Sequence, residues 1–104
     1  MNKFDEKEKS FEKKFAMDEE LQFKIAARSN KYLGEWVSSM LGKNGEEKQN
    51  YIQEIIKADM EEAGNEDVFR KVKKDLHAAS IAIEDSEIRD QMEKALSRAK
   101  EDFK

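Results

Sequence analysis

The chain has 104 residues, enough for one small domain with a modest core, and 42% of its residues are charged, for a net charge of −4. It has no proline and four glycines, too few turn residues for a β-sandwich or an α/β fold, so the sequence predicts an all-α protein. The absence of cysteine excludes disulfides and thiolate metal sites. The acidic balance argues against a nucleic-acid partner, because neutralising phosphates requires an excess of lysine and arginine.

The N-terminal segment, residues 1–17, is charged throughout except for an aromatic stripe. At 100° per residue, Phe4, Phe11 and Phe15 lie within about 40° of one another on a helix. The acidic run that begins at Asp18 is typical of an N-cap and a first turn, so we expect the first helix of the folded domain to start there. We therefore expect residues 1–17 to be mobile or only partly helical in the free protein.

The remainder, residues 18–104, has the apolar spacing of a four-helix bundle. Gly42 is expected to stop the first helix, Gly45 to end the connection that follows, and residues 79–84 to form an extended connector. The predicted helices are 18–41, 46–62, one that follows an N-cap at Asn65, and one capped by Asp85 or Ser86. The predicted buried residues are Ile25, Ala26, Leu33, Trp36, Val37, Met40, Leu41, Tyr51, Ile52, Ile55, Ile56, Met60, Val68, Phe69, Val72, Leu76, Ile88, Met92, Ala95, Leu96, Ala99 and Phe103. The third helix is also expected to carry two ion pairs at four-residue spacing, Glu66 with Arg70 and Asp67 with Lys71.

The sequence offers no catalytic constellation, so we do not expect an enzyme. His77 is the only histidine, and it lacks the converging ligands of a metal site or the orienting partner of a general base. The run from Gly42 to Gly45 has neither the preceding strand nor the spacing of a phosphate-binding loop. We therefore expect no cofactor and no metal ion. With neither a signal peptide nor an apolar run of about 20 residues, the protein is expected to be cytoplasmic.

The three N-terminal phenylalanines have two explanations: they fold back on the bundle, or they dock on a partner. Burying three phenylalanines yields roughly 5–9 kcal/mol, whereas ordering some fifteen residues costs about 1–2 kcal/mol each. The aromatics alone cannot offset that cost. A helix that grows from the bundle when it docks would avoid the nucleation penalty and add ion pairs, which favours the partner. The predicted partner-binding residues are Phe4, Lys7, Glu8, Phe11, Lys14 and Phe15.

The string FDEKEKSFEKKFAMDEELQFKIAARSNKYLGEWVSSMLG, from Phe4 to Gly42, resembles the alphaproteobacterial zeta subunits, which inhibit the F-type ATP synthase. A second block, from Tyr51 to Leu76, is similar to the same family. The resemblance implies a four-helix bundle, monomeric when free, whose N-terminal helix enters an interface of the catalytic head formed by the alpha, beta and gamma subunits. It also implies that the helix blocks rotation in the hydrolysis direction, at the cytoplasmic face of the inner membrane.

Two other functions are compatible with the residues alone. One is a membrane-surface protein that inserts the phenylalanines at the lipid interface, but residues 1–20 carry seven acids against five lysines, so anionic lipids gain nothing net. The other is a small-molecule site, such as a nucleotide site, between helices of the bundle.

Overall fold

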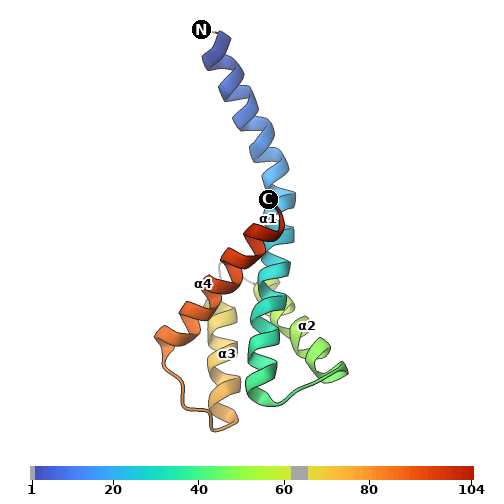
Figure 1. The fold of residues 1–104 in the computed structure, drawn as a ribbon, viewed down its shortest axis with the longest axis vertical. Coiled ribbons are helices and arrows are strands. Elements are labelled where there is room, and N and C mark those ends of the chain that lie inside the picture. The colour runs from blue at the N-terminus through green and yellow to red at the C-terminus, as the bar shows by residue number, and fades with distance from the viewer. Residues whose placement is uncertain (1, 62–65) are drawn as a thin grey trace.

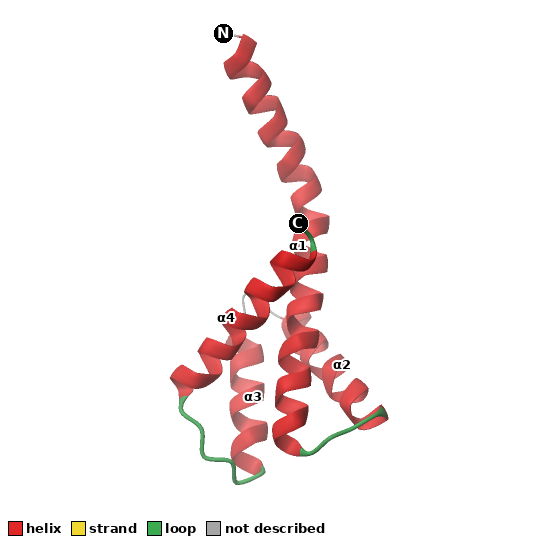
Figure 2. Ribbon diagram, in the orientation of Figure 1, coloured by secondary structure: helices red, strands yellow, loops and turns green. Residues whose placement is uncertain are grey.

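The computed structural model describes the backbone of residues 2–61 and 66–104, and the side chains of residues 19–61 and 66–104. Within these residues it contains four α-helices and no strand, which confirms the predicted all-α class (Figure 2). The helices are α1 (Asn2–Leu41), α2 (Glu46–Glu61), α3 (Glu66–Ala78) and α4 (Asp85–Asp102).

Helix α1 is the longest element, and α2, α3 and α4 all contact it. Its C-terminal half lies among the other helices, while its N-terminal half projects beyond them (Figure 1). The longest dimension of the molecule is 61 Å, close to the roughly 60 Å that 40 helical residues span. The N-terminal segment is thus helical along its backbone.

The helix does not start near Asp18, as the acidic run suggested, but passes through that position without a break. The physical reason is that neither glycine nor proline occurs before Gly34. A helix already nucleated within the bundle therefore meets no residue that would stop its growth toward the N-terminus.

The helix ends follow the predicted turn residues in most places. Gly42 and Gly45 have positive φ angles of 74° and 57°, as expected for the two ends of the α1–α2 connection. The amide of Lys43 donates to the carbonyl of Ser38 at 2.8 Å and closes the last turn of α1. After α3, Ser80 takes a positive φ of 61°. Residues 79–84 form the predicted connector, with a turn at 79–80 and no regular structure at 81–84, where an extended segment was expected.

Two predicted caps have different outcomes. Helix α4 begins at Asp85 with Glu84 as its extended N-cap, so the prediction of Asp85 or Ser86 was late by one or two residues. No side chain caps this end; Asp85 and Glu87 in the first turn place negative charge near the helix N-terminus. The predicted cap at Asn65 lies outside the described residues.

The core is built from all four helices. The cluster at its centre comprises Leu33, Val37, Tyr51, Ile55, Val68, Phe69, Val72, Leu76, Ile88, Met92 and Ala95. Three predicted core residues are exposed instead: Met40, Met60 and Leu96 are 40%, 67% and 38% exposed. Six more are only half-buried, namely Ile25, Ala26, Trp36, Leu41, Ile56 and Phe103. Helical periodicity gives the angular position of a residue but not how far the neighbouring helices extend. The prediction therefore assigned too many residues to the core.

Charged contacts tie the helices together differently from the prediction. Glu66 pairs with Arg89 of α4 through two contacts of 2.9 and 3.0 Å, and the Arg89 guanidinium stacks over Phe69 at 3.9 Å. Lys71 contacts Glu54 of α2 at 2.9 Å and Asp75 at 3.1 Å, instead of the predicted Asp67. Arg70 pairs with Asp67, so ion pairs within α3 occur beside the contacts that Glu66 and Lys71 make with neighbouring helices.

The crossing of α1 and α2 depends on a small residue. A Cβ atom added at Gly34 would lie 2.8 Å from Cγ1 and 3.2 Å from Cα of Ile52. Ser38, one turn later, is fully buried, so two small residues four apart let the helices approach.

Replacing Gly34 by alanine is expected to destabilise the bundle. The alanine gains about 1 kcal/mol in helix propensity, but overpacking against a backbone atom costs about 1–3 kcal/mol. Urea unfolding of Gly34→Ala should show a net loss, whereas Ser39→Ala, at an exposed position of the same helix, should not. A variant more stable than the parent would show that the α1–α2 contact is loose.

Candidate functional site

The predicted partner-binding residues all lie on the N-terminal half of α1. The positions of Phe4, Phe11 and Phe15 share one face of an unbroken helix. The side chains of these residues, and of Lys7, Glu8 and Lys14, lie outside the described part, so their role stays a prediction. The backbone nevertheless places all six on one helix that projects from the bundle (Figure 1).

The same face continues into the bundle. At 100° per residue, Leu33 is in phase with the three phenylalanine positions, and its side chain is buried in the core. The projecting half of α1 therefore continues a face that, further along, packs against the other helices. A partner that covered the phenylalanine positions would extend the packing surface of the bundle itself.

A cluster of polar and aromatic side chains holds α1 against the end of α4. Tyr32 donates a hydrogen bond to Asp102, and the Arg28 guanidinium contacts the same carboxylate at 3.1 Å. Arg28 also lies 5.3 Å from the ring of Phe103, and Arg98 stacks over the ring of Tyr32 at 3.8 Å. We call these five residues the α1–α4 clamp.

The electrostatics of the clamp favour the charged carboxylate. The hydrogen bond from Tyr32, aided by the hydrogen bond and charge of Arg28, holds the pKa of Asp102 below its ordinary value, although partial desolvation opposes this. The clamp lies about one turn before the glycine of the α1–α2 crossing. Together the two contacts fix the direction in which α1 leaves the bundle.

The clamp could not be predicted from the sequence, because Arg28 and Tyr32 lie 74 and 70 residues before Asp102 in the chain. The spacing of Arg28 and Tyr32 by four residues, with a charged helix end elsewhere, is too common to serve as a signal.

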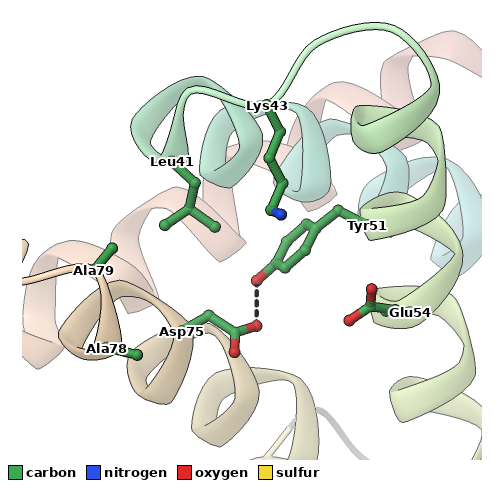
Figure 3. A pocket seen from close by; sticks show the side chains of 7 residues that line it. All are labelled: Leu41, Lys43, Tyr51, Glu54, Asp75, Ala78 and Ala79. Atoms are coloured by element: carbon green, nitrogen blue, oxygen red, sulfur yellow. Dashed lines mark hydrogen bonds between the residues drawn. The ribbon is translucent and has the colours of Figure 1, made fainter.

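A hollow of about 380 Å³ lies between α2 and the end of α3, and it bears on the nucleotide alternative (Figure 3). Tyr51 donates to Asp75 at 2.7 Å across it, and both burial and this bond raise the pKa of the tyrosine. The lining carries two carboxylates, Glu54 and Asp75, but only one cation, Lys43. Lys71 binds both carboxylates, and Lys43 is the one cation in the lining, so the hollow lacks the cluster of cations that a phosphate would require.

The described residues give no sign of metal chemistry or of a membrane span. His77 is exposed on α3, and the described part of the chain contains no group of three metal-binding side chains. Among the described helices none is both long and apolar enough to cross a bilayer.

In the described structure the N-terminal half of α1 projects from a bundle in which α1 is held by the clamp and by α2 (Figure 1). The family model for ATPase inhibitor subunit zeta matches residues 1–102, so the chain belongs to the ATPase inhibitor subunit zeta family. Its members are regulatory proteins and not enzymes, and the family associates the chain with the ATP synthase as an inhibitor.

A solved structure supports the fold independently. A protein determined by solution NMR is 44% identical to this chain, with a TM-score of 0.70, and the match covers 80% of this chain and 94% of that one. No match is found among curated proteins.

The clamp predicts a pH dependence. Because the pKa of Asp102 is lowered in the folded protein, its charge stabilises the fold above the unfolded-state value of about 3.9, and this contribution is lost as the pH falls toward the folded-state pKa. Asp102→Asn should therefore lower the free energy of unfolding at neutral pH, and its difference from the parent should shrink below about pH 4. Urea unfolding as a function of pH measures both.

The control is Asp90→Asn, which removes an exposed carboxylate paired with Lys94 within α4. A difference between Asp102→Asn and the parent that stays constant from neutral pH to pH 2 would contradict the assigned role of the carboxylate.

Proposed function

We propose that the chain inhibits ATP hydrolysis by the F-type ATP synthase by inserting the N-terminal half of α1 into a subunit interface of the catalytic head. The observation that carries this proposal is the continuity of α1, which runs from Asn2 to Leu41, with its C-terminal half among the other helices and its N-terminal half projecting beyond them (Figure 1). A projecting helix on an anchored base is suited to enter a cleft.

Helix continuity supports the energetics of insertion. Ordering an unstructured segment of about fifteen residues costs about 1–2 kcal/mol per residue. This cost exceeds the free energy gained when the three phenylalanines are buried. A segment that elongates an existing helix pays no nucleation penalty, and its backbone hydrogen bonds form within the helix. The bundle therefore acts as the nucleus for the binding segment.

The side chains then have distinct proposed roles. Phe4, Phe11 and Phe15 provide the apolar stripe that the cleft buries, and Lys7, Glu8 and Lys14 form ion pairs at its rim. We assign the cleft to an interface of the alpha and beta subunits that also reaches gamma. The free protein acts as a monomer, on the cytoplasmic side of the inner membrane.

Selective inhibition of hydrolysis follows from differential binding. A helix that binds one conformational state of the rotating head more tightly than the others stabilises that state. Rotation in the hydrolysis direction closes the cleft on the helix, and rotation in the synthesis direction opens it and expels the helix. No catalytic residue is required.

Replacing the three phenylalanines by alanine should abolish inhibition and leave the bundle folded. Each buried phenylalanine contributes about 1.5–3 kcal/mol, and each 1.4 kcal/mol is about tenfold in affinity, so the triple variant should inhibit at least a thousandfold less well. The measurement is ATP hydrolysis by the cognate head titrated with each protein, with circular dichroism as the check on folding.

Met60→Ala serves as the control, because Met60 is an exposed apolar residue far along the chain from this segment. If the triple variant inhibits as well as the parent, the N-terminal mechanism is wrong. If the parent itself leaves hydrolysis unchanged, the proposed inhibition is wrong for this chain.

A further inference from the structure

A groove of about 500 Å³ lies between α1, α2 and the C-terminal end of α4, beside the clamp. Its lining residues are Phe23, Lys24, Ala27, Arg28, Lys31, Gln49, Ile52, Gln53, Ile56 and Phe103. The proposed insertion of the N-terminal segment assigns no role to this groove.

The groove has an apolar floor and an exposed aromatic residue. Ile52 is buried, and Ile56 and Phe103 are half-buried. Phe23 is 62% exposed, although it lies on a helix whose other large apolar residues between positions 25 and 37 are at least half-buried. An aromatic side chain held in water beside an apolar floor is typical of an interaction surface.

The charges of the groove are of one sign. Lys24, Arg28 and Lys31 line it, and no carboxylate does, although the whole chain carries a net charge of −4. Arg28 is already paired with Asp102, but among the described residues Lys24 has only a distant partner, Glu20 at 3.9 Å, and Lys31 makes no ion pair. The surface therefore complements an acidic partner.

The position of the groove connects it to the proposed interface. Phe23 follows Phe15 by eight residues on the same helix, a rise of about 12 Å. A protein that enclosed the phenylalanine stripe would reach the groove within about two further turns. The two surfaces are thus neighbouring parts of one helix.

We propose that this groove receives an acidic segment of the catalytic head that carries apolar side chains, and so anchors the bundle while the N-terminal helix is inserted. The inference rests on the proposed function, since it takes the same head as the partner. A second copy of the chain is a poor occupant, because a symmetric contact would place Lys24 and Lys31 of one groove against the same lysines of the other.

Two variants of the full chain test the groove. Phe23→Ala removes the exposed aromatic residue, and Lys24→Glu with Lys31→Glu reverses two charges. The matched controls are Met60→Ala, which removes an apolar side chain of similar exposure, and Lys94→Glu, which reverses an exposed lysine that pairs with Asp90 just as Lys24 pairs with Glu20.

Binding of each variant to the immobilised cognate head should be measured at low and high salt. We expect both groove variants to raise Kd about tenfold or more, the charge reversal through slower association that also loses its salt dependence, and the controls to stay within about twofold of the parent. Groove variants that bind like the parent would overturn the inference, and so would a charge reversal without effect on association.

A second background separates this inference from the proposed function. In the variant with alanine at positions 4, 11 and 15, residual binding to the head should persist without inhibition, and Phe23→Ala should remove it. If that background still inhibits, the insertion mechanism fails while the groove remains measurable. If its residual binding is unaffected by Phe23→Ala, the groove inference fails. Binding of the parent to anionic vesicles that is lost with Lys24→Glu and Lys31→Glu, without a change toward the head, would identify a lipid surface instead and overturn it.

Discussion

The packing of the C-terminal half of α1 is the constraint on which the rest of the molecule depends. Gly34 allows α2 to approach, Asn30 donates to Asp59 of α2 at 2.9 Å, and Tyr32 binds the end of α4. These contacts hold α1 in place from two sides between Asn30 and Gly34, over about one and a half turns. Because a helix that is fixed over part of its length needs no new nucleus to extend, the same contacts provide the base from which the N-terminal half grows.

The clamp and the groove lie at the N-terminal end of this packed part of α1, and they share Arg28 and Phe103. Arg28 contacts the carboxylate of Asp102 and also lines the groove, and Phe103 lies 5.3 Å from its guanidinium and in the groove lining. The end of α4 is thus part of the structure that orients α1 and part of the surface we assign to the catalytic head. A contact at the groove would act at the point where the projecting helix leaves the bundle.

The fold could be predicted from the sequence to the extent that local patterns decide it. The glycines at 42 and 45 and the apolar spacing gave helix ends and most of the core. Periodicity could not show that Trp36 lies at the edge or that Met60 faces solvent, since that depends on where neighbouring helices end. The N-terminal stripe was visible as a pattern, whereas the clamp and the groove join residues from opposite ends of the chain, and tertiary packing alone reveals them.

We propose that insertion of the N-terminal segment depends on the continuity of α1. A break in this helix, between its projecting half and its packed half, tests the proposal most directly. Glu20→Pro interrupts α1 at an exposed position ahead of the groove and the clamp, at a cost of about 3 kcal/mol to the helix. The account predicts a folded bundle whose inhibition of ATP hydrolysis is weakened about a hundredfold, while Glu20→Ala inhibits like the parent. Inhibition by Glu20→Pro equal to that of the parent would contradict it.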